Sequence, residues 1–141
     1  MYDGGKKMND FVEVAMVNEL DDGNMMMFSI DDREILIARV GDNYYSADNR
    51  CPHMGGNLSG GELDGTIVIC PRHHSQFDLT DGHVIRWTDW SGLKLTAAKI
   101  FKSPRPLKTH EVKIDEGKIW VKIKWSQSIF SKKFNLTDLK L

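Results

Sequence analysis

The stretch CPHMGGNL at residues 51–58 is followed, after a segment rich in glycine, by the related stretch ICPRH at residues 69–73. Each stretch contains one cysteine and one nearby histidine, and a proline directly follows each cysteine. Thiolate sulfur and neutral imidazole nitrogen both bind metals, and grouping them couples metal binding to folding. The sequence therefore predicts a metal site built from two short loops, with four candidate ligands: Cys51, His53, Cys70 and His73.

The order of these ligands bears on the kind of metal. A structural zinc finger usually pairs like ligands within one short loop, whereas here each loop supplies one cysteine and one histidine. A two-iron cluster with both thiolates on one iron and both imidazoles on the other needs two equivalent loops of this kind. Zinc is the alternative occupant. The glycines between the loops, Gly55 among them, suit a backbone that passes close to a cluster and donates N–H groups to its sulfurs.

The ligand spacing C-x-H-x16-C-x2-H resembles the Rieske iron–sulfur signature. Phe77, Asp78 and Gly82 continue the similarity to the cluster loops of soluble Rieske-type ferredoxins, and the resemblance covers roughly residues 10–123. It implies an all-β fold, a Rieske-like antiparallel β-sandwich with a cluster-binding subdomain formed by two loops. It also implies one [2Fe-2S] cluster per chain, held by the four candidate ligands.

The resemblance also implies which residues surround the cluster. Ser75 matches a serine whose hydroxyl bonds to cluster sulfur in high-potential respiratory Rieske proteins, and Gly55 is expected in the loop backbone around the cluster. Pro104 lies in SPRPL at residues 103–107, which resembles the proline-containing loop that covers the cluster. The high-potential proteins also have a tyrosine where this chain has Phe77, and a disulfide between the loops for which it has no further cysteines.

These differences predict a midpoint potential toward the low end of the range of about −150 to +300 mV of Rieske centres. Each hydrogen bond to sulfur favours the reduced, more negative cluster, and only one of two hydroxyl donors is present. The resemblance further implies that His53 and His73 turn their second ring nitrogens outward at the tip of the domain. Oxidation lowers the pKa of such imidazoles, so we expect the midpoint potential to fall as the pH rises.

Voltammetry of the purified protein across pH tests both expectations. A midpoint in the upper half of the range contradicts the first. A midpoint that stays constant up to strongly alkaline pH contradicts the assignment of two imidazole ligands.

The other histidines and two tryptophans are predicted to lie outside the ligand set. His74 adjoins a ligand, but the family spacing favours His73, so His74 is expected at the surface. His83 and His110 lie in strand-like sequence beside turns and are expected to be ordinary exposed or half-buried imidazoles. Trp87 and Trp90 are expected to be core or lid aromatics rather than an electron path.

Short apolar stretches separated by turn sequences predict a β-rich fold. DDGN at residues 21–24 and GDN at residues 41–43 punctuate a β-meander in the first third of the chain. DEG at residues 115–117 predicts a tight hairpin, and Ile119, Val121 and Ile123 alternate onto one face of its second strand. The segment between the two ligand loops is predicted to contain no strand, because its glycines are too frequent. The predicted strands are residues 11–15, 25–30, 34–40, 83–87, 107–114 and 117–124.

Composition excludes several other classes of protein. The 141 residues contain 19 basic and 20 acidic side chains, which describes one small domain without a strong field of either sign and argues against a nucleic-acid binder. No apolar run approaches the roughly 18 residues of a spanning helix, so stable membrane insertion is not expected. Residues 1–11 lack the apolar region of a signal peptide, so a cytoplasmic location is expected.

The predicted domains are a Rieske [2Fe-2S] domain at residues 1–123 and a basic C-terminal tail at residues 124–141. Residues 122–141 contain five lysines and one aspartate, a net charge of +4, which leaves −5 for residues 1–121. Trp125, Ile129, Phe130 and Phe134 have spacings compatible with one face of a short helix. The tail is interpreted as folded back on its own body; protein docking, self-association and membrane contact are the alternatives.

The predicted function is that of a soluble one-electron carrier between a reductase and a terminal oxidoreductase such as an oxygenase. The chain is not expected to be an enzyme, because Rieske oxygenases continue into a catalytic domain whose mononuclear iron needs two further histidines and a carboxylate. Three alternatives remain: a small subunit of a larger reductase such as nitrite reductase, a redox or iron sensor, and a structural zinc module.

Overall fold

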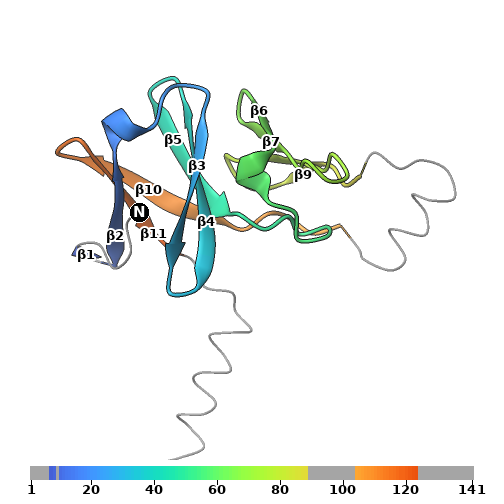
Figure 1. The fold of residues 1–141 in the computed structure, drawn as a ribbon, viewed down its shortest axis with the longest axis horizontal. Helices are drawn as coiled ribbons and strands as arrows, with labels where there is room; N and C mark the ends of the chain where they lie inside the picture. Colours follow the sequence, from blue (N-terminus) through green and yellow to red (C-terminus); the bar gives the residue numbers. More distant parts are fainter. Residues whose placement is uncertain (1–6, 9, 89–103, 124–141) are drawn as a thin grey trace, which may run out of the picture.

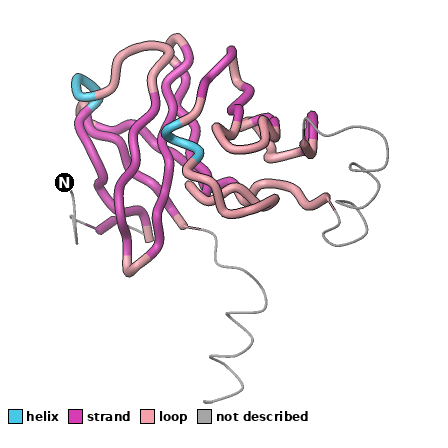
Figure 2. The backbone as a smooth tube through the Cα atoms, turned by 45° about the vertical axis from the view of Figure 1, so that its right-hand side comes forward, coloured by secondary structure: helices cyan, strands magenta, loops and turns pink. Residues whose placement is uncertain are grey.

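The computed structural model describes residues 7–8, 10–88 and 104–123, and Figures 1 and 2 show a large and a small β-sheet side by side. All strand pairs in this part of the chain are antiparallel, and its helices are two short 3-10 turns, η1 (Val17–Glu19) and η2 (Leu58–Gly60). The prediction of an all-β antiparallel fold is confirmed. The strands are β1 (Lys7–Met8), β2 (Phe11–Met16), β3 (Met25–Ile30), β4 (Arg33–Val40), β5 (Asn43–Asp48), β6 (Glu62–Asp64), β7 (Ile67–Ile69), β8 (Gln76–Asp78), β9 (Val84–Arg86), β10 (Thr109–Asp115) and β11 (Lys118–Lys122).

The large sheet has seven strands in the order β1-β2-β11-β10-β5-β4-β3. It folds over on itself, so that side chains of β2 and β11 share one core with side chains of β3 and β4. Ile119 and Val121 of β11 are fully buried in this core, as their predicted shared face requires, but Trp120 between them is also buried, so burial does not alternate along the strand. The buried members of the first core are Val12, Val14, Ala15, Leu20, Phe28, Ile30, Ile35, Ile37, Ile119 and Val121.

Strand β4 is buried on both of its faces. Residues 35–38 form the apolar run ILIA, and all four are 0% exposed. Since successive side chains of a strand point to opposite faces, Ile35 and Ile37 enter the first core, while Leu36 and Ala38 enter a second core. This one strand therefore joins the two hydrophobic cores of the molecule.

The small sheet has four strands in the order β6-β7-β8-β9 and packs on the second core. A backbone bond from the Leu107 N–H to the Gly82 carbonyl (2.8 Å) ties the β8–β9 turn to the segment before β10. The two cysteines are members of this core, so the predicted metal site adjoins well-packed apolar side chains. The buried members of the second core are Leu36, Ala38, Ala47, Cys51, Leu58, Val68, Cys70, Phe77, Leu79, Trp87 and Leu107.

The prediction that the segment between the ligand loops contains no strand is wrong. Strands β6 and β7 both lie in this segment and pair as a hairpin from Glu62 to Ile69. Gly65 has a φ of 58° and lies in the turn between them, where a left-handed conformation favours glycine. The glycine content that argued against strands therefore supplies the turn that joins them. Strand β5 was also absent from the predicted set.

Several sequence predictions concern residues outside the described ranges. Trp90 and the tail at residues 124–141 are among these, and so is Ser103 of the proline-containing run. The domain boundary at residue 123 remains a prediction. Within the described ranges, none of the helices has the length and apolar character that crossing a bilayer requires.

Candidate metal centre

The two predicted ligand loops have the same backbone hydrogen-bond pattern. In each loop the cysteine N–H donates to the carbonyl five residues later, and the N–H four residues later donates back to the cysteine carbonyl. The bonds are Cys51 N–H to Gly56 O (2.9 Å), Gly55 N–H to Cys51 O (2.8 Å), Cys70 N–H to Ser75 O (2.8 Å) and His74 N–H to Cys70 O (3.1 Å). The loops are therefore equivalent turns, as a site with paired ligands requires.

The equivalence of the loops also accounts for His74. The residue four positions after each cysteine has a positive φ, 74° at Gly55 and 58° at His74. His74 is exposed, so the expectation that it lies at the surface is confirmed. It occupies the turn position that glycine takes in the first loop, whereas His73 lies beside the other predicted ligands.

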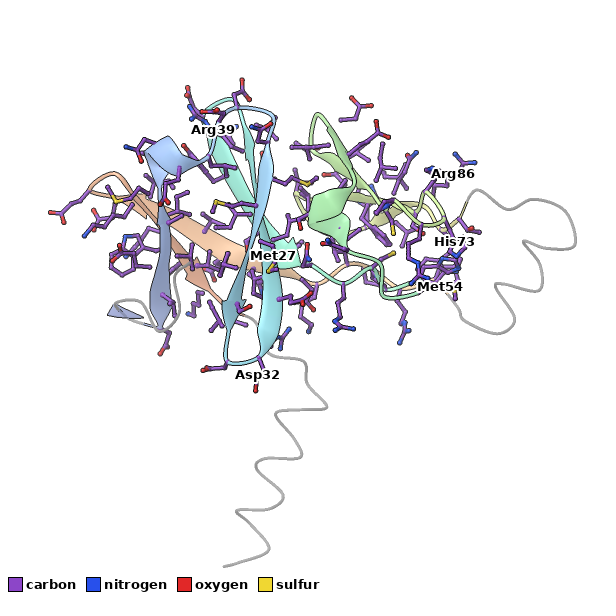
Figure 3. All side chains as sticks on the ribbon, in the orientation of Figure 1. Met27, Asp32, Arg39, Met54, His73 and Arg86 are labelled. Carbon is purple, nitrogen blue, oxygen red and sulfur yellow. The ribbon has the colours of Figure 1, made fainter. Side chains whose placement is uncertain are left out.

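The structure brings the four predicted ligands together as two pairs of like residues. The thiols of Cys51 and Cys70 are hydrogen-bonded to each other, and both residues are almost fully buried. The imidazole rings of His53 and His73 meet edge to face, with 5.3 Å between their centroids. His73 and Met54 mark this end of the small sheet in Figure 3.

This pairing fits a two-iron cluster better than a single zinc ion. A tetrahedral zinc site needs four ligand atoms around one point, but no three His, Cys, Asp or Glu side chains of the described residues converge on a single ion. A [2Fe-2S] cluster of the Rieske type needs a thiolate pair on one iron and an imidazole pair on the other. Cys51 with Cys70 and His53 with His73 match that donor set.

The contact between the two thiols shifts their pKa values in opposite directions. The hydrogen bond from the Cys51 thiol, which outweighs the effect of burial, lowers the pKa of Cys70 to about 6. The same bond and burial raise the pKa of Cys51 well above its usual range. One thiolate is therefore available at neutral pH, and thiolate is the form that binds metal.

The close approach of the second ligand loop leaves no room for a side chain at Gly56. A Cβ atom at residue 56 would lie 2.6 Å from the Cys70 sulfur and 3.2 Å from the Cγ and Cδ atoms of Arg72. A Cβ at Gly55 would meet nothing within 4 Å. Gly55, the glycine named from the sequence, shapes the turn, while Gly56 lets the two loops approach each other.

Ser75 and Trp87 each contact one of the predicted ligands, Cys51 and His53 respectively. The Ser75 hydroxyl donates a hydrogen bond to the Trp87 carbonyl oxygen and also bonds to Cys51, whose pKa it lowers. A hydroxyl has one proton, so these two acceptors share it. The Trp87 ring contacts His53 at a centroid distance of 4.9 Å, and its buried indole N–H has no acceptor among the described residues. An unpartnered donor here suits a bound group that carries acceptor atoms, such as sulfide.

Trp87 is a core aromatic, as predicted, and it makes the environments of the two imidazoles unequal. His53 is only 3% exposed, whereas His73 is half-buried. The expectation that both imidazoles face outward is therefore wrong for His53, which is almost fully buried and contacts the Trp87 ring. His73 is the more accessible of the two.

Asn49 closes the base of the first ligand loop, a role that the sequence analysis did not identify. Its side-chain amide donates to the Asn57 side-chain oxygen (2.7 Å), and its side-chain oxygen accepts from the Ser59 N–H (2.8 Å). Its carbonyl accepts from the Leu58 N–H (2.9 Å). The residue is 1% exposed. The only sequence signal is the pair of asparagines that flank the loop at positions 49 and 57.

The remaining residues named from the sequence have separate environments. Pro104 is exposed, and it begins the described segment that runs back from the cluster end toward β10 (Figure 1). His83 is exposed as expected, and its Nδ1 lies 2.5 Å from an Asp81 carboxylate oxygen. The expectation for His110 is wrong, because its side chain is 0% exposed.

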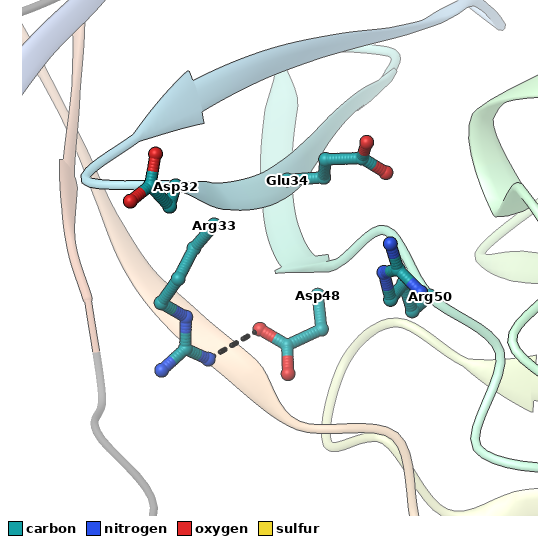
Figure 4. A pocket seen from close by; sticks show the side chains of 5 residues that line it. All are labelled: Asp32, Arg33, Glu34, Asp48 and Arg50. Carbon is teal, nitrogen blue, oxygen red and sulfur yellow. Dashed lines mark hydrogen bonds and ion pairs between the residues drawn. The ribbon is translucent and has the colours of Figure 1, made fainter.

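His110 belongs to a hydrogen-bond network centred on Asp48. One carboxylate oxygen of Asp48 accepts from His110 Nε2 and from an Arg33 guanidinium nitrogen, each at 2.9 Å. Burial raises the pKa of Asp48, but the bonds from His110 and Arg33 outweigh it and hold the pKa below its usual value of 3.8. Arg33 and Asp48, with Asp32, Glu34 and Arg50, line an open pocket of about 190 Å³ (Figure 4). The network lies directly before Asn49 and supports the start of the first ligand loop.

Comparison with known proteins agrees with this geometry. A family model described as the Rieske [2Fe-2S] domain matches residues 10–97. The ferredoxin component of the naphthalene 1,2-dioxygenase/salicylate 5-hydroxylase systems of Ralstonia sp is 25% identical over 114 residues, which is 81% of this chain and 96% of the relative. Ferredoxin CarAc of Metapseudomonas resinovorans is 30% identical over 87 residues, which is 62% of this chain and 68% of the relative.

Solved structures share the fold as well. The ferredoxin of carbazole 1,9a-dioxygenase from Nocardioides aromaticivorans IC177 is 26% identical, with a TM-score of 0.65, and the match covers 81% of this chain and 98% of that chain. The matched family model spans both ligand loops and most of both sheets. The chain therefore belongs to the Rieske [2Fe-2S] domain family.

Proposed function

We propose that this chain is a one-electron carrier that holds one [2Fe-2S] cluster and passes electrons from a reductase to a terminal oxygenase. The observation that carries the proposal is the arrangement of two buried, hydrogen-bonded thiols and two contacting imidazoles on equivalent loops. The names of the relatives support the role, since they are ferredoxin components of dioxygenase, hydroxylase and monooxygenase systems. In this role the chain itself transforms no substrate.

In this proposal Cys51 and Cys70 hold one iron, and His53 and His73 hold the other. The bound cluster supplies a centre that gains or loses one electron. The second core excludes water on the thiol side, while half-buried His73 lies nearer the surface. Ser75, Gly55 and Pro104 are the residues proposed to surround the cluster.

We place the carrier in the cytoplasm as a soluble protein. Cys51 and Cys70 are free thiols, which suits a reducing compartment, where paired cysteines more often bind metal than form disulfides. Residues 124–141 form, in this proposal, a basic segment separate from the Rieske domain.

Metal analysis of protein purified without oxygen tests the function. We expect two irons and two acid-labile sulfides per chain, a brown colour, and a paramagnetic signal that appears on reduction by one electron. Stoichiometric zinc without iron or sulfide would overturn the proposal. Size-exclusion chromatography of native material separates a free carrier from a subunit held permanently on a larger reductase. A partner whose affinity changes with cluster oxidation would indicate a sensor instead.

A further inference from the structure

Among the described residues, the two ligand loops and the adjoining strand β9 contain exposed arginines and no carboxylates. Residues 50–57, 70–77 and 84–88 contain three arginines and neither Asp nor Glu. The β-sheet register pairs Arg86 with Gln76, directly after the second ligand loop. The Arg72 side chain lies against Gly56 of the first loop. Figure 3 shows Arg86, His73 and Met54 at this same end.

In the part of the chain that the structure describes, no carboxylate pairs with Arg72 or Arg86. Both are exposed, and neither takes part in an ion pair with any described residue. Arg86 Nε donates to the Thr88 carbonyl oxygen (3.2 Å), a bond that leaves its positive charge unpaired. On the neighbouring strand β8, Asp78 lies two residues from Gln76, the register partner of Arg86. Glu62 lies in the same row of the sheet as Arg86 but on the far edge strand β6, where it pairs with Ile69 of β7.

Apart from Glu62, the acidic residues of the small sheet lie at its opposite end. Asp78 and Asp81 flank the β8–β9 turn, whose Gly82 bonds to Leu107 beside the large sheet. Asp81 is already paired with His83. Asp78 and Asp81 therefore lie toward the large sheet, whereas Arg72 and Arg86 lie with the ligand loops at the other end of the small sheet.

Two exposed apolar side chains accompany the arginines. Met54 is 50% exposed and Ile85 is 45% exposed, and they are two of the three exposed large hydrophobic residues in the described part of the chain. Met54 follows the predicted ligand His53, and Ile85 precedes Arg86. Protein interfaces commonly combine an apolar centre with a charged rim, and arginine and methionine are enriched in them.

We propose that Met54, Arg72, His73, Ile85 and Arg86 form a docking surface, here called the tip face, for an acidic surface patch of a redox partner protein. This inference rests on the proposed function, since it places the partner beside the more accessible predicted iron ligand. A patch of carboxylates around an apolar recess complements the charge and the apolar side chains of the tip face. Complementary charge steers association and makes its rate depend on salt.

The charge of the whole chain favours a protein partner over a nucleic acid or an anionic membrane. The chain has a net charge of −1, and residues 1–121 have a net charge of −5, so the body of the molecule repels extended polyanions. The positive charge of the tip face is confined to a small area. Such an area suits a compact acidic patch better than an extended phosphate surface, which needs many basic contacts.

Small redox reagents of opposite charge test the field at the tip face. The reduced cluster-loaded protein is mixed in a stopped-flow instrument with hexacyanoferrate(III) or with tris(1,10-phenanthroline)cobalt(III), and oxidation is followed in the visible spectrum. Between about 10 mM and about 100 mM salt the Debye length falls from about 30 Å to about 10 Å. We expect the rate with hexacyanoferrate(III) to fall over this range and the rate with the cobalt complex to rise.

Matched variants locate the effect. The double variant Arg72→Gln/Arg86→Gln is expected to slow oxidation by hexacyanoferrate(III) about three- to tenfold at low salt. Lys118→Gln/Lys122→Gln removes the same charge from strand β11 of the large sheet and is expected to change this rate much less. Equal rates in the two double variants, with the visible spectrum intact, would overturn the docking proposal and leave the carrier function standing. Loss of the cluster spectrum in the wild type would instead overturn the carrier function.

Competition identifies the class of partner. Poly-L-glutamate is expected to inhibit oxidation of the wild type by hexacyanoferrate(III) at low salt, and to inhibit the Arg72→Gln/Arg86→Gln variant less. Equal or stronger inhibition by duplex DNA or phosphatidylglycerol vesicles, at matched charge concentration, would assign the tip face to another class of macromolecule. Salt-dependent self-association that the same variant abolishes would assign it to a second copy of this chain. Either result would overturn the proposal of an acidic protein partner.

Discussion

Replacing Gly56 with alanine is expected to lower the cluster content of the purified protein roughly tenfold or more, as for other changes beside a metal site. The new Cβ atom would lie 2.6 Å from the Cys70 sulfur, closer than real Cβ contacts allow. The sulfur cannot retreat easily, because Cys70 is 2% exposed and belongs to the second core. Iron and sulfide analysis, with the visible spectrum, measures the effect.

Gly55→Ala is the matched control, one residue earlier in the same loop. Its φ of 74° strains any residue with a Cβ, but its Cβ would meet nothing within 4 Å. We expect a lower unfolding temperature, from a strain of about 1–2 kcal/mol, with cluster content close to that of the wild type. Full cluster content in Gly56→Ala, or equal losses in both variants, would contradict the view that close approach of the loops is what Gly56 permits.

Replacing Asp48 with alanine is expected to lower the free energy of unfolding by about 2–4 kcal/mol. The carboxylate accepts hydrogen bonds from both Arg33 and His110, and the His110 side chain is fully buried. Its loss removes the acceptor that holds both donors at the start of the first ligand loop. Denaturant unfolding at neutral pH measures the change. Glu34→Ala removes an exposed carboxylate from the same pocket and is expected to stay within about 0.5 kcal/mol of the wild type.

The contribution of Asp48 has a defined pH dependence. Its pKa in the folded protein lies below the usual value of 3.8, so its stabilisation is fully present above that value and is lost as the pH falls through the folded pKa. The stability difference between wild type and Asp48→Ala should therefore be constant from pH 7 down to about 4 and narrow below it. A difference that narrows already between pH 7 and 5 would contradict the assignment of this pH dependence to Asp48.

Much of the fold could be predicted from the alternation of apolar residues and from turn sequences. Five strands of the large sheet, β2, β3, β4, β10 and β11, lie in stretches that this rule predicts, whereas β1 and β5 of the same sheet do not. The rule failed for β6 and β7, because they are three residues long and lie among glycines that serve their turn and the loop contacts. Burial of His110 was not predictable either. It depends on Asp48, which is 62 residues away in the sequence, and the local pattern around His110 does not reveal that partner.

The candidate site also contains residues that could be predicted from the sequence and residues that could not. The spacing of cysteines and histidines identified four residues that the structure brings together, because metal ligands leave a local signature. Asn49 and Gly56 leave no such signature, since an amide that clamps a loop and a glycine that avoids a sulfur are common residues in any loop. The unequal burial of His53 and His73 was also hidden. Burial of a side chain is set by tertiary contacts, such as that between His53 and Trp87, which the spacing of ligands does not encode.

The double-sided burial of β4 limits how this protein can be engineered. A transplant of residues 49–88 onto a foreign scaffold would carry both ligand loops but leave behind Leu36 and Ala38, which complete the apolar floor under the cysteines. The exposed underside of such a graft would then favour aggregation over metal uptake. A functional graft of this centre therefore needs strand β4 as well, together with the strands that pair with it.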